Sequence, residues 1–482
     1  MVLQRHLPIP VWGTASAGSE VVVRFEKVEL KTQVDADGNW RVSFPARSEG
    51  GPFELSILGD GKSIVFKDIL VGEVWLCSGQ SNMEWSLKRT AEGEREIPNA
   101  NNPNIRLFHL KKKHDMYKSP FTQEQLESFT AGDFFYPAKW EKCSPETAAV
   151  FSGVGYFFGK TLQDSLQIPI GLIQNAVGGS PIQSWISEEA FASHPQLNYF
   201  VKFREGGNWL DLENINPWLK ERALQNWADW VNQEKSGELP GHPFAPTYLF
   251  ESAIQPLQDY PLRGVIWYQG ESNATNPENY AALFELMVKN WRQTWQLDLP
   301  FYFIQLPKIG TRNLWPEFRE AQEKCLAIQN TGMVVAIDGG HPTNVHPKEK
   351  EGISQRLANL ALAKTYGKML LAESPMLSTF EWQKKDRQIV LNFKQTYGGL
   401  KISRGEVPTG FLLQGYLEQG SLEAFIIPEK IRIENEKIIL NYPENFLPVN
   451  VKYAWAPAPD NNIVNSENLP LAPFKILLGG RD

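Results

Sequence analysis

The sequence has few cysteines and no long apolar run, and both absences restrict what the chain can be. Its three cysteines, Cys77, Cys143 and Cys325, are odd in number and far apart, which argues against a disulfide framework or a metal knuckle. No apolar stretch approaches the ~18 residues that would span a bilayer. The first residues, "MVLQRHLPIP", lack the apolar core of a secretion signal. We therefore expect no membrane-spanning segment, and we assign the cysteines no catalytic role.

The sequence also lacks a long cluster of positive charge. The formal net charge is −7, and no run of lysines or arginines is longer than Lys111, Lys112 and Lys113. This charge balance argues against nucleic acid or an anionic membrane as the main partner. The chain does contain 42% hydrophobic residues and 16 tryptophans in 482 residues, which is enough for roughly two to four packed domains. Aromatic faces also suit sugar rings.

Hydrophobic patterning divides the chain into three parts. Residues 1–68 alternate apolar and polar positions in short runs, which predicts an antiparallel β-sandwich. Residues 69–372 alternate strand-like and helix-like stretches, which predicts βαβ units and a mostly parallel sheet covered by helices on both faces. Within this part, residues 196–245 have apolar residues at helical spacings and predict a helical insertion. The strand pattern returns in residues 373–482, where we expect a second β-domain.

Individual elements of the middle part can be placed. The expected strands are residues 69–78, 104–109, 168–175, 263–268, 300–306 and 332–337. The expected helices are residues 151–166, 279–296, 317–329 and 348–366. In a sheet of this kind, ligands bind beyond the carboxyl ends of the strands.

Three polar clusters follow the ends of expected strands. Ser81 comes after one strand, with Gly79 allowing a tight exit, and the segments 175–183 ("NAVGGSPIQ") and 269–273 ("QGESN") follow two others. An acyl-transfer site needs a nucleophile, a base, a group that orients the base, and donors for the oxyanion. Ser81 is the candidate nucleophile; the alternative is a turn residue only.

The base and the oxyanion donors have candidates at other strand ends. His341 and His346 follow an expected strand, and His346 precedes Pro347, which suits the first position of the next helix. His346 is therefore the candidate base, and its alternative role is that of a surface residue beside a helix cap. Gly178 and Gly179 offer backbone N–H groups without side-chain obstruction, although a plain loop would contain the same residues.

Four segments together resemble the sequence blocks of a known family. The segments "GQSNMEW", "GLIQNAVGGSPIQSWIS", "GVIWYQGESNA" and "HPKEKEGISQRLA" are similar to those of sialate O-acetylesterase-like proteins, a branch of the SGNH hydrolases close to family 6 acetylxylan esterases. The terminal segments "MVLQRHLPIPVWGTASAGSEVVVRF" and "LPVNVKYAWAPAPDNNIVNSENLPLAPFKI" also resemble that family, so the likeness covers nearly the whole chain. It implies an SGNH-type, three-layer α/β core flanked by N-terminal and C-terminal β-domains.

The resemblance implies an esterase that removes acetyl groups from sugar hydroxyls through an acyl-serine intermediate, without a metal or an organic cofactor. Ser81 would attack the acetyl carbonyl, and His346 would move the proton. The backbone N–H groups of Ser81 and Gly179 would form the oxyanion hole, completed by Gln269 or Asn273, of which we favour Gln269. Members of the family are often exported, which implies a periplasmic or secreted protein.

One position departs from the family pattern. The family usually has an aspartate two or three residues before the histidine, where this chain has Asn344 and Thr343. Glu271 resembles a glutamate that orients the histidine in some family 6 esterases, and we favour it as the third member over Asn344 and Asp338. An amide in that place can favour the wrong tautomer of the histidine and weaken activity. Asp338 and the two histidines after it could also be a metal cluster, but no fourth ligand has suitable spacing.

Substrate contacts follow from the same likeness. Gln80 beside the nucleophile, and Arg319 and Gln322 in the segment "REAQ", are candidates near the pocket, with Arg319 as the cation that would face a sialic acid carboxylate. Trp185 and Trp315 either stack on a sugar ring or belong to the core. The predicted function is that of a carbohydrate O-acetylesterase acting on an acetylated sugar or glycan. Among such enzymes we favour a sialate O-acetylesterase. The alternatives are an acetylxylan or other polysaccharide esterase, and a catalytically weak sugar-binding protein.

Overall fold

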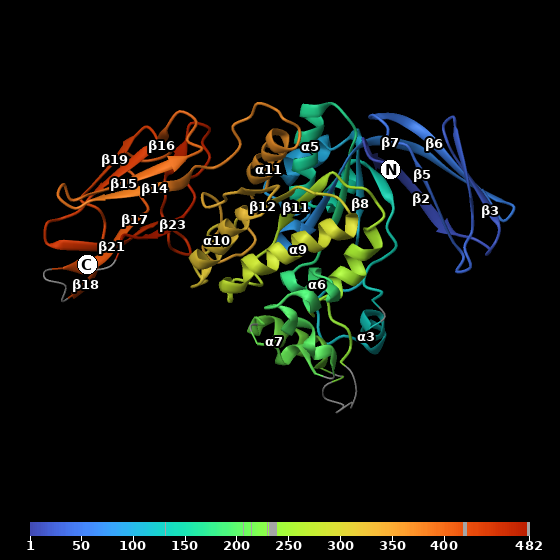
Figure 1. Ribbon diagram of the computed structural model, residues 1–482, viewed down its shortest axis with the longest axis horizontal. Helices are drawn as coiled ribbons and strands as arrows, with labels where there is room; N and C mark the ends of the chain where they lie inside the picture. The colour runs from blue at the N-terminus through green and yellow to red at the C-terminus, as the bar shows by residue number, and fades with distance from the viewer. Residues whose placement is uncertain are drawn as a thin grey trace. The chain divides into compact units, whose positions relative to one another are not determined.

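The computed structural model describes residues 1–130, 132–205, 207–213, 215–228, 230, 239–417 and 422–479. The chain divides into two compact units. Unit 1 comprises Met1–Tyr268 and Glu285–Phe301, and unit 2 comprises Gln269–Phe284 and Tyr302–Asp482. The strands form a large sheet of mixed direction and several separate antiparallel sheets, so the predicted α/β class with additional β-sheets is confirmed (Figure 1).

The first part of unit 1 is built from short, mostly antiparallel strands. They are β1 (Val2–Gln4), β2 (Ile9–Thr14), β3 (Glu20–Phe25), β4 (Val28–Gln33), β5 (Asn39–Phe44), β6 (Gly50–Gly59) and β7 (Lys62–Gly79). β2 pairs with β5, while β3 pairs with β4 and β6, and β6 pairs with β7. Alternate residues of β3, Val21, Val23 and Phe25, are buried in a common core with Trp40 and Ile69. This period of two is the pattern that predicted strands here.

β7 continues from this part into the parallel sheet of unit 1. The sheet has the order β11-β7-β10-β8-β9, in which the further strands are β8 (Asn102–His109), β9 (Trp140–Cys143), β10 (Ile170–Ala176) and β11 (Gly264–Tyr268). β7, β8, β10 and β11 run parallel, and β9 runs antiparallel to β8. Since β7 passes through residues 68 and 69 without a break, the N-terminal strands and the parallel sheet share one strand.

The helices of unit 1 lie between and after these strands. They are α1 (Ser81–Glu84), α2 (Gly93–Glu96), α3 (Gln123–Thr130), α4 (Pro145–Val150), α5 (Gly153–Leu166), α6 (Glu188–Ser193), α7 (Pro217–Asn226) and most of α9 (Tyr280–Trp295). The segment predicted as a helical insertion, 196–245, contains α7 and 3-10 turns at Asn198–Glu205 and Trp209–Asp211. Its residues 206, 214, 229 and 231–238 lie outside the described part of the chain.

Helices cover both faces of the parallel sheet. Trp75 of β7 packs edge-on against Phe158 of α5, with ring centroids 5.1 Å apart. Trp267 of β11 pairs in register with Ser78, so its side chain lies on the face opposite to that of Trp75, where it packs against Trp291 of α9. In Figure 1, α5 and α9 accordingly lie on opposite sides of β11 and β8.

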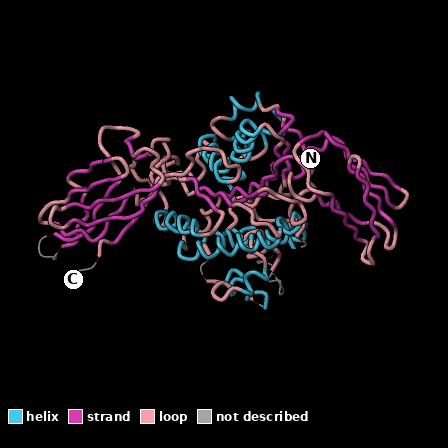
Figure 2. The backbone as a smooth tube through the Cα atoms, turned by 45° about the horizontal axis from the view of Figure 1, so that its top comes forward, coloured by secondary structure: helices cyan, strands magenta, loops and turns pink. Residues whose placement is uncertain are grey.

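Unit 2 contains β12 (Phe301–Ile304), β13 (Thr331–Val334), α10 (Trp315–Lys324), α11 (Glu351–Lys364) and a run of C-terminal strands. These strands are β14 (Met376–Gln383), β15 (Gln388–Lys394), β16 (Leu400–Ile402), β17 (Phe411–Leu417), β18 (Leu422–Ile426), β19 (Lys430–Glu434), β20 (Lys437–Asn441), β21 (Phe446–Tyr453), β22 (Ile463–Asn465) and β23 (Phe474–Leu477). They form the antiparallel sheets β14-β15-β20-β19 and β18-β17-β21-β23 and the pair β16-β22. Figure 2 shows this region as strands and loops, as the sequence pattern predicted.

The start of α11 was predicted wrongly. The sequence placed Pro347 in the first position of this helix, but the helix begins at Glu351 and His346 lies in the preceding loop. The side-chain oxygen of Asn344 accepts the His346 N–H at 2.9 Å, and this local turn holds the chain out of the helix. The strand expected at residues 69–78 begins seven residues earlier, at Lys62, and the other expected strands and helices of the middle part are confirmed within a few residues. No helix among the described residues is long and apolar enough to cross a membrane.

Candidate active site

Three parallel strands of unit 1 end side by side. Gly79, the last residue of β7, pairs with Ala176 of β10 and with Tyr268 of β11. Gly79 has a φ of +136°, and a methyl group on its Cα would lie 2.2 Å from the Tyr268 carbonyl oxygen, so only glycine fits. The segments that follow these strands therefore start from neighbouring points on one sheet edge.

Ser81 begins the short helix α1 directly after this strand end. Its side chain is partly exposed, whereas its neighbours Gln80 and Asn82 are buried. The backbone N–H of Gln80 donates to the Tyr268 carbonyl oxygen at 3.0 Å, which fixes the turn against β11. Because only 3% of Gln80 is exposed, its placement favours a role in this turn over the predicted substrate contact.

The glycine loop after β10 lies against Ser81. A methyl group built on Gly178 would lie 3.5 Å from the Ser81 Cβ and 2.9 Å from Glu84 Oε2. The Gly178 N–H donates to Glu84 Oε2 at 2.9 Å, and Lys112 Nζ forms an ion pair with Glu84 at 2.7 Å. Glu84 therefore joins the glycine loop to the helix that carries the nucleophile candidate. Sequence reasoning missed Glu84, because a carboxylate in a first helical turn is ordinary.

Gly179 requires glycine for two reasons. Its φ of +82° is in the left-handed region, which a side chain disfavours. A methyl group there would also lie 2.8 Å from the Phe244 ring and 3.1 Å from the Trp218 ring. The loop backbone is thus packed between α1 and two aromatic side chains from the segment 196–245. The abundance of aromatic residues in that segment was the available signal, but the sequence did not place them here.

In unit 2, the segment after β11 forms a hydrogen-bonded turn. Gln269 Nε2 donates to Asn273 Oδ1 at 2.7 Å, and the Tyr280 hydroxyl donates to Gln269 Oε1 at 3.2 Å. Gln269 and Asn273 are both buried, while Glu271 between them is partly exposed. The structure thus brings the two oxyanion candidates of this segment together, with the Asn273 amide oriented by Gln269.

His346 lies partly exposed in the loop between β13 and α11. The turn before it is held by two side chains. Asn344 Oδ1 accepts the His346 N–H, and His341 Nδ1 accepts the N–H groups of Thr343 at 3.2 Å and Asn344 at 3.0 Å. The side-chain oxygen of Asn344 is therefore engaged by the backbone, which favours a role in the turn over a role in orienting the imidazole of His346.

Asp338 is engaged by a cation of α11. Its two carboxylate oxygens accept from Arg356, with Nη1 to Oδ1 at 2.9 Å and Nη2 to Oδ2 at 2.5 Å. Such a bidentate pair leaves little capacity to orient an imidazole. Within the described ranges, no group of three or more His, Cys, Asp and Glu side chains is arranged to hold a metal ion.

Arg319 lies in the interior of unit 2 rather than at a surface. Its guanidinium donates to the carbonyl oxygens of Leu306, Pro307, Ala456 and Pro457 at 2.8 to 2.9 Å. The side chain has no exposed surface, and burial lowers the pKa of Arg319 to about 9. Arg319 therefore fastens the C-terminal segment to the end of β12, and the structure gives it no access to a substrate carboxylate.

Three further predicted contacts also lie in the interior. Gln322 Oε1 accepts the Leu306 N–H at 2.8 Å, which supports the same strand end. Trp185 is fully buried and packs edge-on against Trp267, and Trp315 is 1% exposed. For the two tryptophans, the structure favours the core alternative over sugar stacking.

Replacing Arg319 with methionine should destabilise the protein rather than alter its selectivity. Four carbonyl groups would lose a charged donor, so the free energy of unfolding should fall by about 3–5 kcal/mol. Denaturant unfolding measures this, with Arg312→Met, an exposed arginine, as the matched control. An Arg319→Met variant of unchanged stability that binds anionic substrates more weakly would contradict the structural role.

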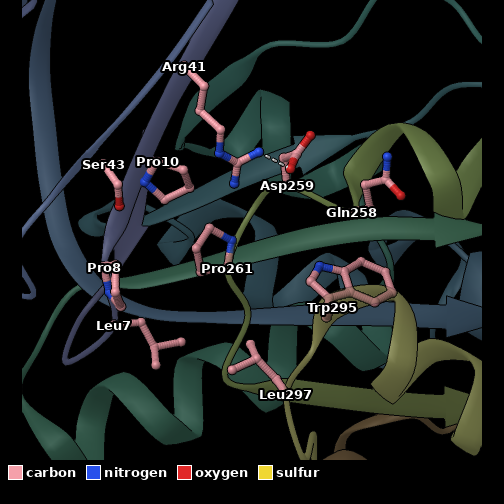
Figure 3. A pocket seen from close by; sticks show the side chains of 10 residues that line it. All are labelled: Leu7, Pro8, Pro10, Arg41, Ser43, Gln258, Asp259, Pro261, Trp295 and Leu297. Carbon is pink, nitrogen blue, oxygen red and sulfur yellow. Dashed lines mark hydrogen bonds and ion pairs between the residues drawn. The ribbon is translucent and has the colours of Figure 1, made fainter. Parts of the chain in front are cut away.

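Figure 3 shows a hollow of about 190 Å³ in unit 1 that none of the candidate active-site residues lines. It is lined by Pro10, Trp295 and the ion-paired side chains of Arg41 and Asp259. Asp259 precedes β11, which starts at Gly264, so the hollow is near the amino end of a strand whose carboxyl end adjoins Gly79. It is separate from the candidate active site.

The segments around these residues match a known protein family. A family model described as carbohydrate esterase, sialic acid-specific acetylesterase, matches residues 71–199 and 228–365, which is more than half of the chain. The chain belongs to this family of carbohydrate esterases. It is therefore an ester hydrolase, and the resemblance noted in the sequence is confirmed.

Relatives of this esterase have been described in mammals and bacteria. The sialate O-acetylesterase of Rattus norvegicus is 28% identical and that of Mus musculus 30% identical, each over 82% of this chain and 77% of the relative. A crystal structure of a carbohydrate acetylesterase from Xanthomonas citri is 30% identical, with a TM-score of 0.78 over 99% of this chain and 97% of that one. The residues that match the family model include Ser81, Gly179, Glu271 and His346, but not residues 200–227.

Proposed function

We propose that this esterase removes O-acetyl groups from acetylated sialic acids through an acyl-serine intermediate. The observation that carries the proposal is the placement of Ser81 at a strand end against the Gly178–Gly179 loop, in a chain of the carbohydrate esterase family. Acyl transfer requires a reachable hydroxyl close to backbone N–H donors, and Ser81 is partly exposed beside the backbone of this glycine loop.

The chemistry would proceed in two half-reactions. Ser81 Oγ attacks the acetyl carbonyl while His346 takes its proton, and the carbonyl oxygen gains negative charge. Collapse of this intermediate breaks the bond to the sugar oxygen, which leaves with the proton from His346. A water molecule, deprotonated by the same histidine, then attacks the acyl-serine. The bond between the acyl carbon and Ser81 Oγ breaks, Ser81 takes the proton back from His346, and acetate is released.

The oxyanion would be held by the N–H groups of Ser81 and Gly179, with a third donor from the segment 269–273. The hydrogen bond from Gln269 Nε2 to Asn273 Oδ1 supports Asn273 as that third donor, because it fixes the opposite, donor end of the same amide. Gln269 would then be a positioning residue. This is a change from the sequence-based preference for Gln269.

Glu271 would orient His346 and stabilise its charged form. Two observations support Glu271 over the other candidates: Asp338 is paired with Arg356, and Asn344 Oδ1 accepts a backbone N–H. A carboxylate stabilises an imidazolium, whereas an amide does not. We also propose that residues 69–372 form an SGNH-type three-layer core, with residues 1–68 and 373–482 as flanking β-domains.

Acetate release from a panel of esters tests the substrate. We expect the highest kcat/KM on O-acetylated sialic acid, a lower value on acetylated xylan, and a measurable rate on an aryl acetate. The acetylated xylan arm is included because the relative from Xanthomonas citri is described only as a carbohydrate acetylesterase. Higher activity on xylan than on sialic acid would replace the proposed substrate with a polysaccharide.

Covalent labelling separates an enzyme from a sugar-binding protein. A fluorophosphonate probe reacts with an activated serine, so it should add one label, located at Ser81 by peptide mass spectrometry. An unlabelled protein that still binds acetylated sugars would mean that the proposed mechanism is wrong.

A further inference from the structure

Tyr117, Trp218 and Arg222 lie together in unit 1, and we call them the aromatic–arginine cluster. Trp218 and Arg222 are four residues apart on α7, so they share one face of that helix. The Arg222 Cζ lies 5.7 Å from the Tyr117 ring centroid and 5.9 Å from that of Trp218. The two ring centroids are 6.3 Å apart.

The cluster reaches the nucleophile candidate through the glycine loop. The Tyr117 ring and the Ser81 Cβ lie 3.7 Å and 3.5 Å from the same point, the position that a Cβ on Gly178 would take. The Trp218 ring lies 3.1 Å from the equivalent point on Gly179. Since 47% of Tyr117 is exposed, the cluster opens to solvent beside Ser81.

A buried asparagine holds the cluster in place. Asn226, at the end of α7, donates from Nδ2 to the carbonyl oxygens of Met116 at 3.2 Å and Lys118 at 2.9 Å, on both sides of Tyr117. The Asn226 carbonyl oxygen also accepts the Phe121 N–H at 2.8 Å. The loop that carries Tyr117 is thus fastened to the helix that carries Trp218 and Arg222.

The charge of Arg222 is not neutralised by any described carboxylate. Its guanidinium lies against the two rings, and Arg222 Nε is buried without a hydrogen-bond acceptor among the described residues. A guanidinium that stacks on aromatic faces keeps its edge free for a carboxylate, to which it can donate two parallel hydrogen bonds. A buried donor of this kind is costly unless a ligand or water satisfies it.

We propose that the aromatic–arginine cluster is the subsite for the sugar, and that Arg222 selects acetylated sugars that bear a carboxylate. The rings of Tyr117 and Trp218 would contact the apolar face of the sugar, and Arg222 would bind its carboxylate. This proposal rests on the proposed function of Ser81. The ranges that match the family include Tyr117 but omit residues 200–227, so Trp218 and Arg222 lie in a segment that the family model does not include.

The test compares two substrates that differ only in charge: an O-acetylated sialic acid, and the same compound with its carboxyl group blocked as an amide. Arg222→Gln should lower kcat/KM for the acid by roughly 10- to 100-fold, mainly through KM, and change that for the amide by less than about twofold. Arg222→Lys keeps the charge without the planar guanidinium, so its kcat/KM for the acid should lie between those of the parent and Arg222→Gln. Arg24→Gln removes an exposed arginine of β3 and is the matched control for the loss of charge.

Equal losses on the acid and the amide, or no loss on either, would overturn the role of Arg222. Thermal unfolding of each variant identifies a general loss of folded enzyme. Such a loss would lower the measured kcat/KM for both substrates equally and so count against the proposal. Ser81→Ala, assayed on the amide, keeps the two proposals apart. If acetate release from the amide does not depend on Ser81, the proposed function fails whatever Arg222 does.

Discussion

Ser81→Ala should lower kcat for acetate release by at least about 10⁴-fold, because an acyl-enzyme cannot form without the hydroxyl. The residual rate would come from substrate binding and the oxyanion donors alone. Stability should hardly change, since Ser81 is partly exposed at the start of a four-residue helix. Enzymatic determination of released acetate, together with the melting temperature, measures both effects.

A matched control for this variant exists in β7, the strand that precedes Ser81. Ser63 also stands in a Gly-x-Ser sequence, Gly61-Lys62-Ser63, but it is exposed at the other end of β7. Ser63→Ala should therefore retain the parent rate. Comparable rates for Ser81→Ala and the parent would end the serine mechanism, and comparable losses in Ser81→Ala and Ser63→Ala would point to a defect of β7 rather than to chemistry.

Glu271→Gln should lower kcat by about 10²- to 10⁴-fold. An amide keeps nearly the same shape, but it neither stabilises the imidazolium nor fixes the productive tautomer of the histidine. The loss should appear in kcat with little change in KM, because the effect arises as the histidine takes the proton. Steady-state kinetics on one acetylated sugar give both constants.

Two variants distinguish Glu271 from its rivals. Asp338→Asn breaks an exposed pair with Arg356 and should change kcat by less than about threefold. Asn344→Ala removes the acceptor of the His346 N–H and should loosen the loop. We expect kcat to fall by roughly tenfold or less. A larger fall in kcat for either variant than for Glu271→Gln would transfer the orienting role to that residue.

The sequence predicted those features that local patterns determine. Period-two alternation gave the strands of residues 1–68, and apolar runs gave β7, β10 and β11, because side-chain burial in a sheet follows directly from spacing. The position of Ser81 next to the glycine loop followed from the rule that parallel strands end at one edge. These inferences needed no knowledge of distant contacts.

Features that depend on contacts between residues distant in the chain could not be predicted from the sequence. Arg319 was assigned to a substrate, but its partners include Ala456 and Pro457, more than a hundred residues later. Trp218 and Arg222 lie in a segment that the sequence predicted only as a helical insertion, and their approach to Tyr117 depends on hydrogen bonds made by the buried Asn226. The start of α11 was predicted wrongly for a different, local reason, since one side-chain hydrogen bond at Asn344 outweighed the preference of proline for a helix start.

The continuity of β7 limits how this enzyme can be recombined with its relatives. Residues 62–71 pair with β6, and residues 70–79 pair with β1, β10 and β11, so one backbone segment carries both hydrogen-bond networks. A chimaera joined at residue 68 would take the two ends of this strand from different parents, so side chains from one parent would have to pack beside sheet neighbours from the other. A chimaera of two homologues should therefore be joined after Gly79. Residues 1–79 should all come from the same parent.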